Sequence, residues 1–254
     1  MQHVQLFPPG MTLLALVWLL LDATFLITLL WHLLQGCKSG HSLLCSVFQD
    51  LIRYGKTKTG LQRPAWLQWF DIPKRCFWHF YCVSLIWNGC LLWILLRLLL
   101  QSVPVPEWLQ LVLHFLHAGS EPQILVSTDN LLTQCHWYHI LGLALYIWAS
   151  LHQYRCHCIL AGLRKSASGN VINLNHSVPC GDWFERVSCP HYFAELLIYV
   201  SIAVVFGLLN TIWWLVVLFV LLNQALAALL CHEFYHEKFD TYPIHRKAFI
   251  PFIF

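Results

Sequence analysis

The stretch that decides the fold is 192–230, YFAELLIYVSIAVVFGLLNTIWWLVVLFVLLNQALAALL, near the end of the chain. It contains two almost unbroken apolar runs, 192–209 and 212–230, with little more than an Asn-Thr pair between them. A helix needs roughly 20 apolar residues to cross about 30 Å of hydrocarbon, and each run is close to that length. The stretch therefore predicts two transmembrane helices joined by a tight turn.

Three further runs of this kind lie upstream, at 11–34, 77–100 and 137–160. Of the 254 residues, 58% are hydrophobic, 13 are Trp and only 11% are charged, which leaves too much apolar surface for one soluble core. We therefore expect an all-α protein, a multi-span bundle of five membrane helices in a single membrane domain, with a polar tail at 231–254.

The basic residues indicate how the bundle is oriented. No Lys or Arg occurs from 98 to 154, whereas basic residues are present in the segments 35–76, 161–191 and 231–254. Because basic loops stay in the cytoplasm, we expect these three segments, the C-terminus included, to be cytoplasmic. The net charge of +3 follows from such loops and does not indicate a nucleic-acid partner.

The tail carries hydrogen-bond donors next to an apolar span. His232, Tyr235 and Arg246 are of the types that hold a phosphate group, since Arg forks onto phosphate oxygens and keeps its charge. An amphipathic tail that merely rests on the bilayer surface is the alternative. The residue types alone leave both interpretations open.

Motifs in both halves of the chain resemble those of one enzyme family. They are Tyr54-Gly55-Lys56, Ala65-Trp66 and Asp71-Ile72-Pro73 in the N-terminal half, and Phe234-Tyr235, Tyr242-Pro243, Arg246-Lys247-Ala248 and Ile250-Pro251-Phe252 in the tail. Together they resemble the steroid 5α-reductase family, from about residue 48 to the end. Members of that family reduce conjugated C=C bonds with NADPH inside the membrane, so the resemblance implies an NADPH-dependent oxidoreductase acting on CH-CH groups.

On this match the first loop supplies the substrate side of the site. Asp71 stands where the family has its catalytic carboxylic acid, and Lys56 and Trp66 would bind substrate. A desolvated carboxyl group at the edge of a membrane cavity keeps its proton and can donate to a carbonyl oxygen. The alternative is that Asp71 only caps the helix that starts near Pro73.

The same resemblance implies that the third cytoplasmic region holds the cofactor. Gln153, His157 and Arg164 would line the dinucleotide site together with Glu195, and the tail residues would complete it. The alternative for Arg164 is an ordinary cytoplasmic anchor of a span. The sequence has neither a G-x-G-x-x-G turn nor a P-loop, so NADPH would be held without a Rossmann fold.

Two segments, 48–56 and 181–185, look most like the branch of the family that converts polyprenal to dolichal in the endoplasmic reticulum membrane. The implied substrate is polyprenal or a similar isoprenoid lipid, with 3-oxo-Δ4-steroids as a further possibility. The implied chemistry is hydride transfer to the β-carbon of the enal and protonation of the α-carbon, while acid donors polarise the aldehyde oxygen.

The chain departs from the family in one respect, the number of spans. Members have seven, and we count five, with the missing pair expected between about residues 120 and 128. In the family that region supplies the Tyr that works with the acidic residue. Two alternatives follow: an inactive shortened form that acts as a membrane interaction protein, and an isoprenylcysteine-type methyltransferase, which would bind S-adenosylmethionine.

The segment His232-Glu233-Phe234-Tyr235-His236 matches H-E-x-x-H, a motif that places two imidazoles on one helix face for zinc. A third protein ligand normally lies well downstream. Only 18 residues follow His236, and Asp240 is too close to be that ligand. We therefore expect no metal.

Overall fold

The computed structural model describes residues 12–35, 43–53, 55–58, 65–70, 77–101, 107, 111, 136–163 and 176–254. This part of the chain is built mainly from helices and short 3-10 turns. In chain order they are α1 (Leu13–Gln35), α2 (Leu43–Ile52), η1 (Gly55–Lys58), η2 (Ala65–Phe70), α3 (Phe77–Gln101), α5 (Trp137–Gly162), η5 (Asp182–Glu185), α6 (Pro190–Phe206) and α7 (Thr211–Lys238).

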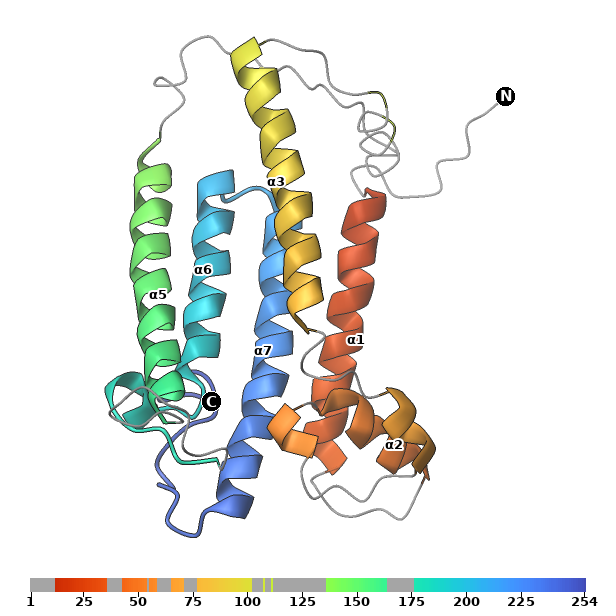
Figure 1. Cartoon of the computed structure of the whole chain (residues 1–254), viewed down its shortest axis with the longest axis vertical. Coiled ribbons are helices and arrows are strands. Elements are labelled where there is room, and N and C mark those ends of the chain that lie inside the picture. Colours follow the sequence, from red (N-terminus) through yellow and green to blue (C-terminus); the bar gives the residue numbers. More distant parts are fainter. Residues whose placement is uncertain are drawn as a thin grey trace.

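The long helices run roughly parallel to one long axis of the molecule (Figure 1). Contacts connect α5 to α6, α6 to α7 and α7 to α1, so these four form a row with α7 and α6 in the middle. The end of α1, α2, the start of α6, the end of α7 and the C-terminus gather at one end of the bundle (Figure 1). The connection from α6 to α7 lies at the other end.

The protein is an all-α membrane helical protein, as the composition predicts. A helix covers each of the five apolar stretches. Among the residues described, Leu13–Leu34 and Thr211–Lys238 are long and apolar enough to cross a membrane by length and composition. That all five stretches cross stays a prediction.

Two helix ends differ from the sequence expectation. Helix α6 ends at Phe206, before the expected 209, because Gly207 has a φ of +100° that breaks the helix. Asn210 then caps α7 by accepting a hydrogen bond from Trp213 N at 3.4 Å. At its other end α7 continues to Lys238, well into the segment expected to be tail.

Helices α5 and α6 approach each other closely because small residues lie between them. Gly142, Ala149 and Cys156 recur every seven residues on α5, and all three are buried. A Cβ atom on Gly142 would lie 2.6 Å from Val205 Cγ2 and 2.9 Å from Ser201 O of α6. In lipid, where apolar burial alone does not favour association, such close packing is what holds two helices together.

Aromatic contacts hold helix α1 against α7. Helix α1 also contains a buried polar side chain whose burial costs free energy. Phe219 lies edge-on to Trp18 and Phe25, with ring centroids 5.5 and 5.0 Å apart. Asp22, between them on α1, is only 4% exposed, and neither of its carboxyl oxygens has a hydrogen-bond partner. An unpaired carboxyl group costs free energy here, so α1 depends on its apolar contacts.

Gly142→Ala tests the close packing of α5 and α6. The added methyl group forces the helices apart, and we expect the substitution to destabilise the protein by roughly 1–3 kcal/mol. Gly89→Ala on α3 is the control, because no atom lies within 4 Å of its Cβ position. Thermal unfolding in detergent compares the two variants. Equal midpoints would show that the α5–α6 contact tolerates a side chain.

Candidate functional site

A cavity of about 520 Å³ opens where the ends of α5 and α7 meet the start of α6. Its wall combines imidazole, phenol and thiol groups with aliphatic side chains. The lining residues are His157, Leu160, Ala161, Leu163, His176, Ser177, His191, Tyr192, Cys231 and Tyr235. Such a mixture of apolar surface and a few polar groups is typical of small-molecule sites.

The cavity brings together two residues that the sequence assigns to the cofactor, His157 and Tyr235. Tyr235 is 4% exposed, and its ring stacks on that of Tyr242 at 5.4 Å with an angle of 6°. The ring of His157 lies 5.6 Å from that of His191. His176 and Tyr192 were not assigned, and only their polar or aromatic type could have suggested them.

Two other predicted residues lie near the cavity without lining it. Glu195 is on α6, one turn after His191. Gln153 is half-buried on α5, one turn before His157. Their predicted contact with a cofactor stays a prediction.

Ser188 connects α7 with the tail. Its Oγ lies 2.6 Å from His232 Nδ1 and 2.7 Å from Tyr242 OH, and it donates to Lys247 O at 3.2 Å. His232 Nε2 in turn lies 3.1 Å from His236 Nε2. Ser188 is 1% exposed and Tyr242 is 4% exposed, so these two hydroxyl groups have protein atoms rather than water as partners.

The backbone closes the same junction. Ser188 N donates to Lys247 O at 2.8 Å and Lys247 N donates to Arg186 O at 2.9 Å, around a parallel bridge between Val187 and Lys247. Burial raises the pKa of Tyr242, although Ser188 and the charge of Arg246 act in the opposite direction. The phenol therefore keeps its proton at neutral pH and remains available as a donor.

Arg246 is a buried contact between the tail and the segment before α6. It is 3% exposed, donates from Nη1 to Pro179 O at 2.8 Å, and has Nη2 3.6 Å from Glu185 Oε2. Glu185 also accepts from Gly181 N at 2.6 Å. These partners all belong to the protein, and the predicted contact of Arg246 with a phosphate stays a prediction.

The substrate-side predictions can be followed only in part. Asp71 lies outside the residues that the structure describes, as does Arg164 of the cofactor side. The backbone of Lys56 belongs to η1. Trp66 lies on η2 and is 49% exposed. None of these substrate-side assignments is tested by the structure.

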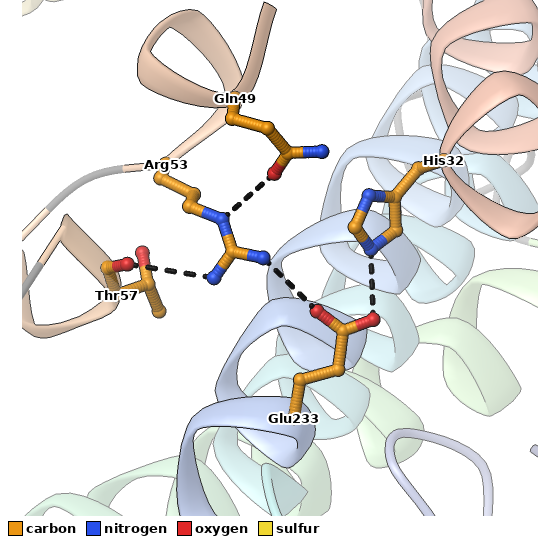
Figure 2. A network of polar contacts seen from close by, with 5 residues as sticks. All are labelled: His32, Gln49, Arg53, Thr57 and Glu233. Carbon is orange, nitrogen blue, oxygen red and sulfur yellow. Dashed lines mark hydrogen bonds and ion pairs between the residues drawn. The ribbon is translucent and has the colours of Figure 1, made fainter. Parts of the chain in front are cut away.

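Glu233 of the H-E-x-x-H segment has protein partners. Glu233 accepts hydrogen bonds from His32 Nε2 at 2.8 Å and from Arg53 Nη2 at 3.3 Å, both from the N-terminal part of the chain (Figure 2). Within the described ranges, no group of three His, Cys, Asp or Glu side chains could hold a metal ion. No local sequence pattern indicates Arg53 and His32 as the partners of Glu233, because they lie 180 and 201 residues away.

Ser188→Ala tests the junction of α7 and the tail. The change leaves His232 and Tyr242 without a buried partner, which should cost roughly 1–3 kcal/mol. We expect faster amide hydrogen exchange at Lys247 and its neighbours. Ser201→Ala is the control, since Ser201 is equally buried but donates only to Ile198 O in its own helix. Identical exchange in both variants would contradict a role for Ser188 in tail docking.

Comparison with known proteins shows the family of the chain. Residues 124–254, which include every residue lining the cavity, match the family described as 3-oxo-5-alpha-steroid 4-dehydrogenase. A polyprenal reductase of Xenopus tropicalis is 79% identical over 308 positions, covering 96% of this chain and all of the relative. Polyprenal reductases of Xenopus laevis and Homo sapiens are 65% and 44% identical, over 100% and 94% of this chain and 100% and 95% of the relatives. The chain therefore belongs to the 3-oxo-5-alpha-steroid 4-dehydrogenase, or steroid 5α-reductase, family.

Proposed function

We propose that this protein is an NADPH-dependent reductase that converts polyprenal to dolichal. The observation that carries the proposal is the 79% identity to a relative named polyprenal reductase, covering all of that relative. An isoprenoid aldehyde is a membrane-dissolved substrate, which fits a protein built from apolar helices. An enzyme that catalyses this reaction is an oxidoreductase acting on CH-CH groups.

The cavity at the ends of α5, α6 and α7 fits one end of a dinucleotide. Its volume of about 520 Å³ lies within the usual range of ligand pockets, roughly 300–1,000 Å³. The rings of His157, His176, Tyr192 and Tyr235 can stack on a base, an interaction that every purine face allows. NADPH, when bound, supplies the hydride for the reduction. Arg164, which directly follows the lining residue Leu163, is our candidate for holding a phosphate, with Arg246 as a second.

Gln153, Glu195 and His232 would complete the cofactor side, because each lies within about one helical turn of a residue that lines the cavity. Lys56, Trp66 and Asp71 would form the substrate side. Asp71 donates a hydrogen bond to the aldehyde oxygen, on which negative charge develops as the β-carbon is reduced. A donor that is already in place at such an oxygen typically contributes 10²- to 10³-fold in rate.

The protein is shorter than its relatives, and this bears on turnover. The alignment with the Xenopus tropicalis protein has 308 positions, so at least 54 of them, 308 minus 254, have no counterpart here. Two spans need roughly 40 residues, and the family match begins at residue 124, within the stretch where the gap is expected. We infer that a two-span segment carrying a second donor is absent, and that NADPH binding is retained better than turnover.

We place the protein in the endoplasmic reticulum membrane as a multi-pass protein with a cytoplasmic C-terminus. The basic segments of the first loop and the tail lie at the same end of the bundle (Figure 1). We expect an N-glycan acceptor introduced near Gly119 to be glycosylated in microsomes and one near Ser168 to remain unmodified. The reverse pattern of glycosylation would invert the orientation.

The cofactor assignment is tested by measuring NADPH affinity in Arg164→Ala. Loss of a charge-assisted hydrogen bond should weaken binding by roughly 10- to 100-fold. Arg155→Ala is the matched control, because Arg155 is an exposed cation on α5 that does not line the cavity. Equal affinity in both variants would mean that Arg164 only anchors the helix end.

The reaction is tested with purified protein, NADPH and polyprenal, beside the same chain with a family-like two-span segment restored at 120–128. We expect both to bind NADPH and the restored chain to turn over at least 10²-fold faster. Absence of NADPH binding from both chains would refute the proposed function. If the shorter chain binds NADPH without turnover while the restored chain turns over, the result would favour a role of the shorter chain as a membrane interaction protein.

A further inference from the structure

A buried polar cluster joins the N-terminal part of the chain to α7. Arg53 donates from Nη2 to Glu233, from Nε to Gln49 Oε1 at 2.9 Å, and from Nη1 to Thr57 O at 3.5 Å (Figure 2). His32 lies on the other oxygen of Glu233. Arg53 is 6% exposed and His32 is 3% exposed, whereas the side chain of Glu233 is 24% exposed, so the cluster is buried on the side of its two donors.

The cluster fixes the first loop at the end of α1. Gln49 lies on α2 and Thr57 on η1, so the Arg53 guanidinium holds both of these elements against α7. Asp50 and Lys58 form a second link between α2 and η1, at 3.3 Å. These contacts determine where the chain leaves η1 toward the segment 65–71, to which substrate binding is assigned.

Glu233 lies on the opposite face of α7 from the cavity. Cys231 and Tyr235, two residues before and two residues after it, both line the cavity, whereas Glu233 is not among the lining residues. Residues two apart on a helix point about 200° away from each other. A single turn of α7 therefore carries the cofactor cavity on one side and the anchor of the first loop on the other.

We propose that Glu233, with Arg53 and His32, is a positioning residue that holds α2 and η1, which includes the proposed substrate residue Lys56, at a fixed place relative to the cofactor face of α7. It acts without touching either ligand. The proposal rests on the proposed function, since it concerns that same site. A fixed carboxylate and a forked guanidinium suit this task because two directed hydrogen bonds specify orientation, which apolar contacts do less well.

Glu233→Gln is the first test. We expect amide hydrogen exchange in 43–58 to rise and kcat/KM for polyprenal to fall by roughly 10- to 100-fold, because small misplacements of reacting groups have effects of this size. NADPH affinity should stay within about twofold, since the cavity lies on the other face of α7. Glu237→Gln is the matched control, an exposed carboxylate one turn later on the same helix.

A neutral double variant separates positioning from stability. In Arg53→Met with Glu233→Gln, no uncompensated charge is buried and the amide still accepts from His32, so the melting temperature should recover relative to the single variant. Exchange in 43–58 should remain high and turnover low. Recovery of turnover together with stability would overturn the positioning role.

Two other outcomes also decide the question. A parallel loss of NADPH affinity in Glu233→Gln would place Glu233 in the cofactor site instead, and unchanged exchange in 43–58 would show that the anchor is not needed. If the unsubstituted protein binds NADPH but does not reduce polyprenal, the proposed function fails. The exchange measurement still decides whether Glu233 holds the first loop.

Discussion

A polar group at the end of an apolar bundle must find its partner within the protein, and this constraint organises the molecule. Arg53 and Ser188 are almost fully buried there, and an unpaired buried charge costs several kcal/mol. Among the described residues, Arg53 donates to Gln49, Thr57 and Glu233, and the Oγ of Ser188 lies beside His232, Tyr242 and Lys247. Since these partners come from distant parts of the chain, satisfying them also assembles the end of the bundle at which the site lies.

Two kinds of contact, apolar packing and directed hydrogen bonds, stabilise the bundle at different positions along the helix axes. Near the start of α5, Gly142 approaches the last turns of α6 through a small-residue surface, and Phe219 of α7 lies between aromatic rings of α1. These contacts are apolar and hold the helices at a fixed separation. Near the end of α7, directed hydrogen bonds fix orientation. The cavity forms where both kinds meet, next to Tyr235.

The sequence predicts the helices well because a run of apolar residues is a local signal. The resemblance likewise placed His157 and Tyr235 at one site, which the cavity unites. Helix α7 extends beyond the expected span, through residues His232, Glu233 and His236, which the sequence analysis assigns to the tail. Contacts from other elements satisfy His232 and Glu233, so the helix continues to Lys238. The partners His32 and Arg53 are too far away in sequence for any local pattern to reveal them.

The separation of these partners has a consequence for how the protein is made. His32 and Arg53 leave the ribosome about 200 and 180 residues before Glu233, a delay of roughly 10–40 s at typical rates of synthesis. During that time the first helix and loop carry ionisable groups whose final acceptor does not yet exist. The N-terminal third thus makes its native contacts with α7 only after α7 has been inserted. A chain interrupted before α7 leaves His32 and Arg53 without the Glu233 carboxylate.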